Sequence, residues 1–158
     1  MNNILRQATL GFLVKDNKVL LAMKKRGFGM GKWNGVGGKP EGEETIEETS
    51  KREIMEEISV VVKSQELMAK IKFYFKNNED WNQEVVVYKI NDWENEPQES
   101  EEMAPKWYDI NEIPYDKTWV DDKFWLPKVL NGEKIEAKFV FGDNEEILEM
   151  EIKKVDKF

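Results

Sequence analysis

Three glutamates, Glu53, Glu56 and Glu57, have the spacing of one helix face. If residues 45–58 form a helix, positions three and four apart are neighbours on its surface, and the three carboxylates share an arc of roughly 100°. Carboxylates this close repel each other, and a hard divalent cation bound through oxygen ligands is their usual compensation. The spacing therefore predicts that this acidic face holds a metal ion.

The same predicted helix has a second face that can be buried. An adjacent stripe carries Ile46, Ser50, Ile54 and Ile58, so the helix can pack on one side while its carboxylates face a cleft. Arg52 flanks the acidic face and is expected to orient the carboxylates or partly neutralise their charge.

Glycines dominate the segment before this helix. Residues 34–42, NGVGGKPEG, contain four glycines and one proline, a composition that disfavours both helix and strand. Such a loop lets backbone atoms approach a ligand or a metal ion closely. Because the next helix is acidic, we expect phosphate to bind here through a metal ion rather than at a bare helix terminus.

Composition narrows the chemistry further. The 158 residues are 40% hydrophobic and fit a single domain spanning residues 1–158. A net charge of -8 disfavours binding to a nucleic acid polymer. The N-terminal segment has no apolar run long enough for a secretory or membrane segment, so a cytoplasmic protein is expected. Because the chain lacks cysteine and histidine, proton transfer falls to carboxylates.

Residues 38–57 resemble the signature of the Nudix hydrolases. Gly38 is followed after five residues by Glu44, and after seven more by Arg52-Glu53-Ile54-Met55-Glu56-Glu57. The signature normally ends in glycine, whereas this chain has Ser59 at the turn that closes the helix. The resemblance implies an α/β chain with the Nudix fold, a mixed β-sheet sandwiched between α-helices. It also implies that Glu44 orients the loop and Arg52.

The Nudix resemblance implies the metal site as well. Magnesium is the expected ion, with manganese as an alternative. The expected ligands are the carbonyl of Gly37 and the carboxylates of Glu53, Glu56, Glu57 and Glu102. Glu57 is expected to be the most damaging single loss, and Glu102 either joins the ligands or acts as the base. The catalytic roles are thus assigned to Arg52, Glu53, Glu57 and Glu102.

Matches outside the signature resemble one branch of the family, the MutT-type 8-oxo-dGTP diphosphatases. They comprise MKKRGFGMGKWNGVGGK at residues 23–39, Glu102-Met103 followed by Trp107, and WVDDKFWLP at residues 119–127. This resemblance implies hydrolysis of oxidised purine nucleoside triphosphates, of the 8-oxo-dGTP and 2-oxo-dATP type, to the monophosphate and pyrophosphate, which sanitises the nucleotide pool. The expected partner is a nucleoside triphosphate, and the chain is expected to act as a monomer.

The same resemblance implies which residues bind the nucleotide. They are Thr9, Lys24, Phe28, Asn34, Gly37, Gly38, Phe73, Trp119, Asp121 and Asp122. If one carboxyl of the Asp121–Asp122 pair is protonated and the other ionised, the pair presents a donor beside an acceptor, and exchanging these roles would admit different purines. The pair can also be interpreted as a helix N-cap, and capping and recognition can coexist. Two positions depart from the pattern: Gln83 replaces an apolar pocket residue, and Gly42 stands one residue early in the acidic turn.

Two other functions stay open from the sequence. One is Nudix hydrolysis of another nucleoside diphosphate derivative, such as a nucleotide sugar or a dinucleotide, or of dNTPs without discrimination. The other is a catalytically silent binding module with a Nudix fold, against which the intact set of three glutamates argues.

Periodicity and turn residues predict the secondary structure. Strands are expected at residues 8–14, 18–24, 60–62, 67–75, 83–90 and 107–110, and a final hairpin pairs 138–141 with 147–152. A second helix is expected over residues 121–130, and residues 24–34 and 91–102 are predicted to be loops.

Overall fold

The computed structural model describes residues 5–158, so the first four residues of the predicted domain lie outside the described part. The strands are β1 (Arg6–Lys15), β2 (Lys18–Lys24), β3 (Trp33–Asn34), β4 (Val61–Phe75), β5 (Gln83–Glu94), β6 (Met103–Asp109), β7 (Lys134–Phe141) and β8 (Ile147–Val155). The helices are α1 (Ile46–Ile58) and α2 (Asp122–Leu130), and the short 3₁₀ turns η1 (Glu79–Trp81) and η4 (Asp143–Glu145) lie between β4 and β5 and between β7 and β8. Neither helix of this described part has the length and apolar composition needed to cross a membrane.

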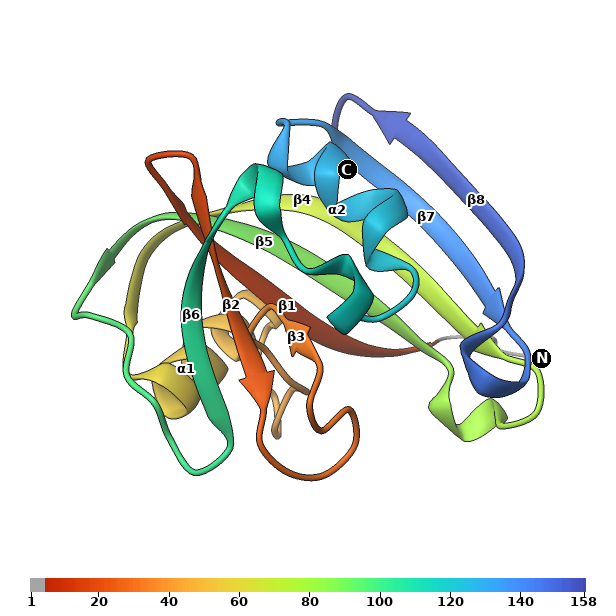
Figure 1. Ribbon diagram of the computed structural model, residues 1–158, viewed down its shortest axis with the longest axis horizontal. Helices are drawn as coiled ribbons and strands as arrows, with labels where there is room; N and C mark the ends of the chain where they lie inside the picture. Colours follow the sequence, from red (N-terminus) through yellow and green to blue (C-terminus); the bar gives the residue numbers. More distant parts are fainter. Residues whose placement is uncertain (1–4) are drawn as a thin grey trace.

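The strands form a mixed sheet with a helix on each side (Figure 1). Their order is β3-β2-β1-β5-β4-β7-β8, with β6 beside β2. β1 runs parallel to β5 and β4 runs parallel to β7, whereas the other neighbours are antiparallel. The predicted α/β fold with a mixed sheet between helices is therefore confirmed.

Two hydrophobic cores lie on the two sides of this sheet. Successive residues of β1 alternate between them, so Phe12 packs with Trp125 in the core under α2, and Leu13 packs with Ile54 and Ile58 in the core under α1. Each of these side chains is at most 1% exposed. The predicted apolar stripe of α1 is thus its buried face, and its glutamates are left for another surface.

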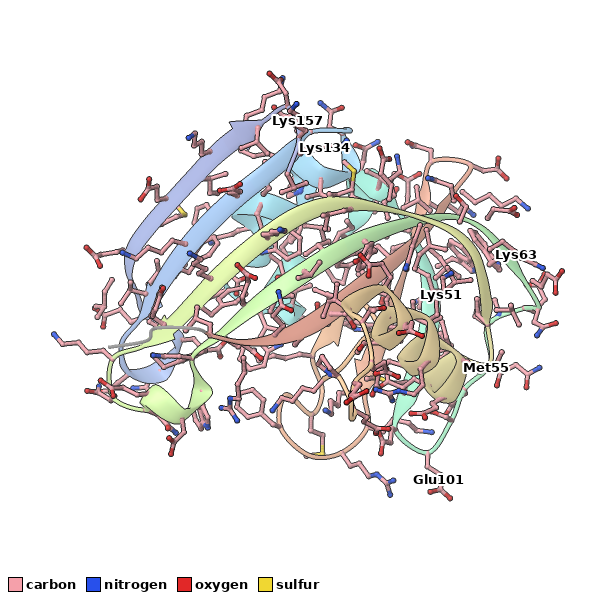
Figure 2. All side chains as sticks on the ribbon, turned by 180° about the vertical axis from the view of Figure 1, so that it is seen from behind. Lys51, Met55, Lys63, Glu101, Lys134 and Lys157 are labelled. Atoms are coloured by element: carbon pink, nitrogen blue, oxygen red, sulfur yellow. The ribbon has the colours of Figure 1, made fainter. Side chains whose placement is uncertain are left out.

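α1 begins and ends at residues that satisfy its terminal backbone groups. Thr45 caps the N-terminus: its hydroxyl accepts the Glu48 N–H at 3.2 Å, and the Glu48 carboxylate accepts the Thr45 N–H at 2.9 Å. At the other end Ser59 takes a left-handed φ of 61°, and its N–H donates to the Met55 carbonyl. Serine at this position therefore introduces some backbone strain, but the C-terminal capping hydrogen bond of the helix is still made. Figure 2 shows Lys51 and Met55 on the solvent side of this helix.

Several strand boundaries differ from the prediction because backbone pairing continues past the apolar pattern. The predicted strands 60–62 and 67–75 form one strand, β4, whose polar middle pairs with β5 across register shifts. β5 continues to Glu94, β6 begins at Met103, and β7 begins at Lys134, all outside the predicted limits. Two residues of the predicted loop 24–34 form β3 against β2. Polar side chains interrupt an apolar pattern without removing the backbone hydrogen bonds that hold a strand.

The glycine-rich loop fills an opening in the sheet. β1 and β2 pair only next to their shared turn, and the loop then runs along β1, where the Thr9 N–H donates to the Gly38 carbonyl at 2.8 Å. A Cβ atom on Gly37 would lie 2.0 Å from the Thr9 carbonyl oxygen. Only glycine permits this approach, which fixes the loop beside Arg52 and Glu53 in the middle of α1.

Candidate active site

The metal and phosphate end of the site begins where α1 meets the glycine-rich loop. The Gly38 N–H donates to the Thr9 hydroxyl at 3.2 Å, which ties the loop to β1 a second time. A Cβ atom on Gly38 would lie 2.4 Å from Cδ of Glu53. The Glu53 carboxyl group therefore lies directly over a backbone that β1 holds in place.

Arg52 organises the acidic face of α1. Its Nε and Nη2 donate to the two carboxylate oxygens of Glu44 at 2.7 and 2.9 Å, and Nη2 also donates to the Lys39 carbonyl at 2.9 Å. Its Nη1 donates to Glu53 at 2.7 Å and to Glu56 at 3.2 Å. The Arg52 hydrogen bonds lower the pKa of Glu44 to about 2. Glu44 thus lies on Arg52, as its predicted orienting role requires, and Arg52 positions Glu53.

The Glu57 carboxyl group is buried, and one of its oxygens, Oε2, lacks a compensating hydrogen-bond partner among the described residues. Burial raises the pKa of Glu57 to about 8, with further contributions from the charge and hydrogen bond of Glu53 and the charge of Glu102, whereas Lys24 acts in the opposite direction. Glu53 and, from a distant segment, Glu102 therefore lie near enough to act on the Glu57 carboxyl group.

The donor set suits a divalent cation. A buried carboxylate oxygen without a partner, beside two further carboxylates, gains most from an oxygen-preferring divalent cation. Within residues 5–158 no group of three or more carboxylates is arranged so that it could hold a metal ion by itself. A magnesium ion is usually held by one or two carboxylates together with substrate phosphates and water. Glu56 is the outermost of the predicted ligands, because its side chain is 56% exposed and bonded to Arg52.

Glu102 is held by residues that the sequence prediction missed. The Lys25 N–H donates to the Glu102 carbonyl at 2.8 Å, and the Lys25 ammonium donates to the Ser100 carbonyl at 2.9 Å. The Arg26 guanidinium lies 3.4 Å from the Glu102 carboxylate. The available signal was the complementary charge of the basic run 24–26 and the acidic run 99–102.

The nucleotide end of the site is a cavity of about 830 Å³ that reaches the glycine-rich loop. All the residues predicted to bind the nucleotide line it: Thr9, Lys24, Phe28, Asn34, Gly37, Gly38, Phe73, Trp119, Asp121 and Asp122. Gln83, the polar departure, lines it too. Asn34 has a fixed orientation, because its side-chain oxygen accepts the Gly35 N–H at 2.8 Å.

The Asp121–Asp122 pair is buried in the wall of this cavity. The two side chains are 4% and 3% exposed, and the Trp125 indole N–H donates to the Asp121 carboxylate at 2.7 Å. Burial raises the pKa of both groups, and that of Asp122 rises well above its usual range because it also faces the charge of Asp121. Asp121 makes no side-chain cap to α2. Asp121 therefore stands at the N-cap position of α2 but does not cap the helix through its side chain, and its carboxylate binds the Trp125 indole.

Aromatic side chains close the outer part of the cavity. The Phe28 ring lies between Trp81 and Trp119, with its centroid 5.2 Å from each. The Lys32 ammonium lies 4.9 Å from the Trp119 ring centroid. Trp81 was not predicted as a site residue, because a single tryptophan in a turn carries no spacing signal.

Comparison with known proteins identifies the architecture. The NUDIX domain model matches residues 5–129. The chain belongs to the Nudix family. An oxidized purine nucleoside triphosphate hydrolase of Danio rerio is 40% identical to this Nudix chain over 148 residues, which cover 94% of each protein. A Mus musculus protein of the same name is 39% identical over 97% of each. The crystal structure of a MutT protein from Bacillus halodurans superposes with a TM-score of 0.83 and 27% identity, covering 94% of this chain and 98% of that one.

Proposed function

We propose that this Nudix protein hydrolyses oxidised purine nucleoside triphosphates, of the 8-oxo-dGTP and 2-oxo-dATP type, to the monophosphate and pyrophosphate in a magnesium-dependent reaction. One observation carries the proposal: a single cavity joins the buried Asp121–Asp122 pair to the glycine-rich loop under Glu53. A base-reading end and a phosphate-handling end thus share one binding site. The names of the relatives from Danio rerio and Mus musculus support the same substrate class.

The residues of the acidic end would hold the ion. We assign this role to the Gly37 carbonyl and to the carboxylates of Glu53, Glu56, Glu57 and Glu102, with Glu102 also available as a base. The bound ion would neutralise charge on the phosphate oxygens as the phosphorus is attacked by water. Manganese could replace magnesium, because both prefer oxygen ligands.

The protein's own part in this reaction is positioning and proton placement. Arg52 holds the Glu53 carboxylate at 2.7 Å and keeps it against the loop. Glu57, whose pKa is raised to about 8, can hold a proton near neutral pH until a cation or substrate binds. Glu102 is then the carboxylate that accepts the proton released by the attacking water, in a chain without histidine.

At the other end, the Asp pair would read the purine. Two buried carboxyls in contact retain a proton between them, so one donates while the other accepts. Phe28 and Trp119 provide stacking surfaces, and the Asn34 amide provides a donor and an acceptor. We propose that exchange of the proton between Asp121 and Asp122 admits both oxidised guanine and oxidised adenine.

A pyrophosphate-release assay with magnesium tests this function. Turnover should be measured on 8-oxo-dGTP, 2-oxo-dATP, the normal dNTPs and ADP-ribose, and kcat/KM should be highest for the two oxidised purines. Similar values on all dNTPs would instead indicate a broad pyrophosphatase. Preference for ADP-ribose, or no release on any nucleotide, would overturn the proposal.

We also propose that the residues 1–158 act as a single domain, as a monomer and in the cytoplasm. We propose the cytoplasm because the proposed substrate is a free nucleotide of the cellular pool. Gel filtration with light scattering tests the oligomeric state directly.

A further inference from the structure

Three segments far apart in the sequence meet around the mouth of the cavity. They are the loop 25–32, the turn between β4 and β5 and the turn between β7 and β8. Phe28 contacts Trp81 between the first and second, and the Lys32 ammonium lies 3.2 Å from the Glu145 carboxylate between the first and third. The Asn77 amide donates to Asp143 at 2.7 Å between the second and third. We call these segments the cavity rim, and their contacts form a closed ring.

Phe28 is the part of this rim with the weakest support from its own backbone. Its neighbours Gly27 and Gly29 have φ values of 79° and 84°, so the local chain relies on glycine conformations. The Phe28 side chain is 60% exposed. Its position therefore depends on the two indoles, Trp81 and Trp119, that flank it.

Trp81 is itself anchored to the sheet. Its ring meets Phe75 of β4 edge-on, at a centroid distance of 5.6 Å, and Phe75 stacks on Phe141 of β7 at 5.3 Å. Trp81 is 48% exposed, and it lines the cavity. A row of aromatic rings thus runs from the sheet through Trp81 to Phe28.

We infer that Trp81 is a specificity-determining residue that acts through Phe28. It holds the Phe28 ring beside Trp119, so that an incoming base meets an aromatic wall that is already ordered. A preformed wall saves the entropy of ordering a side chain on binding, and the two-ring face of a purine gains more from it than the single ring of a pyrimidine. The inference rests on the proposed function, because it concerns base recognition at the same site.

The test compares Trp81→Ala and Trp81→Phe with the wild type. Dissociation constants for 8-oxo-dGMP and dCMP should be measured by calorimetry, together with kcat and KM for 8-oxo-dGTP and dCTP. Loss of one aromatic pair predicts purine binding weaker by roughly 2- to 10-fold, in both Kd and KM, with kcat and the dCMP affinity little changed. Trp81→Phe should recover most of the purine affinity. Trp93→Ala, which breaks the stacked Trp93–Trp107 pair in the other core, is the matched control and should leave purine binding unchanged.

A double-mutant cycle with Phe28→Ala tests the route of the effect. In the Phe28→Ala background, Trp81→Ala should cause no further loss of purine affinity. Equal loss for dCMP and 8-oxo-dGMP, unchanged purine affinity, or full additivity with Phe28→Ala would overturn the inference. Thermal unfolding of each variant shows whether the fold is retained.

The binding arm separates this inference from the proposed function. If 8-oxo-dGMP binds but the triphosphate is not hydrolysed, the proposed function fails and the cycle still tests Trp81. If the triphosphate is hydrolysed and Trp81→Ala changes nothing, only the inference fails. If the wild type neither binds 8-oxo-dGMP nor hydrolyses the triphosphate, both are overturned.

Discussion

The carboxyl group of Glu53 lies directly over Gly38, so that a Cβ atom at position 38 would fall 2.4 Å from the Glu53 Cδ. This relationship links the glycine of the loop to the placement of a carboxylate fifteen positions later in the printed sequence. The end of a flexible side chain can move aside at little cost in folding. The same movement takes the carboxylate away from Glu57 and Arg52.

Gly38→Ala is therefore expected to damage activity more than stability. We expect kcat/KM to fall by about 10- to 100-fold, the usual effect of disturbing a metal site's supporting groups, with an unfolding temperature within a few degrees of the wild type. Gly42→Ala is the control, because a Cβ there meets nothing within 4 Å although its φ is 57°. A Gly42→Ala variant that lost as much activity would show that any disturbance of the loop lowers activity, without displacement of Glu53.

Glu53→Gln and Glu57→Gln should each abolish magnesium-dependent turnover. The amide removes the charge that a divalent cation needs while keeping the shape of the side chain, so a fall of about 100-fold or more in kcat is expected. Glu57→Gln should in addition raise the unfolding temperature of the metal-free protein at neutral pH. Folding raises the pKa of Glu57 from 4.5 to about 8, so between these values the folded wild type must keep a proton that the unfolded chain releases, whereas the amide is neutral in both states. Lys51→Gln, on the solvent side of α1 (Figure 2), is the matched control. Full activity in both glutamate variants would refute the site assignment.

Asp122→Asn is expected to change how stability depends on pH. Folding raises the pKa of Asp122 well above 3.8, chiefly through burial and next through the charge of Asp121. Above pH 3.8 the folded protein thus keeps a proton that the unfolded chain releases, so the free energy of unfolding falls as pH rises from 3.8 toward the raised pKa. The amide of the variant stays neutral, so its stability should fall less over this window.

Denaturant unfolding of the metal-free protein between pH 4 and pH 9 checks this expectation. The difference in the free energy of unfolding between the wild type and Asp122→Asn reports on Asp122 alone, because both proteins contain the other carboxylates. Glu44 is an example: its lowered pKa gives stability that is lost only in acid. The free energy of unfolding of the variant should increase relative to that of the wild type as the pH rises. A constant difference across the range would mean that Asp122 ionises normally in the fold.

Asp121→Asn and Asp122→Asn should alter the ranking of oxidised purines rather than lower all activities alike. Each substitution fixes one partner as a neutral group and prevents the exchange of donor and acceptor between the two carboxyls. The ratio of kcat/KM for 8-oxo-dGTP to that for 2-oxo-dATP should move in opposite directions in the two variants. Equal losses on both nucleotides would count against proton exchange.

Lys25→Met should lower kcat without changing the affinity for the base. Lys25 holds the segment that carries Glu102 through the Ser100 carbonyl, so its loss should misplace that carboxylate. We expect kcat to fall by about 3- to 10-fold on every nucleotide, an effect of the size usual for supporting groups, while the Kd of 8-oxo-dGMP stays the same. Lys51→Met is the control, because Lys51 is exposed on the solvent side of α1 (Figure 2). A parallel rise in Kd would instead place Lys25 in the base site.

Local spacing was enough to predict the helix that carries the glutamates, the shaped loop before it and the buried stripe of Ile54 and Ile58. Helix periodicity and glycine conformations act over a few residues, so they can be read directly from the chain. The nucleotide residues were predicted from short matched segments. Their assembly into one cavity agrees with that prediction.

Contacts between distant segments depended on the tertiary structure. β1 and β2 pair only next to their shared turn and then diverge. The glycine-rich loop therefore lies against Thr9, and Gly38 lies under Glu53. In the buried wall of the cavity, the Asp121 carboxylate binds the Trp125 indole and makes no side-chain cap to α2. The meeting of Trp81 with Phe28 depends on three turns converging. Such contacts have no period in the sequence, because strand order and packing, not spacing along the chain, set which side chains become neighbours.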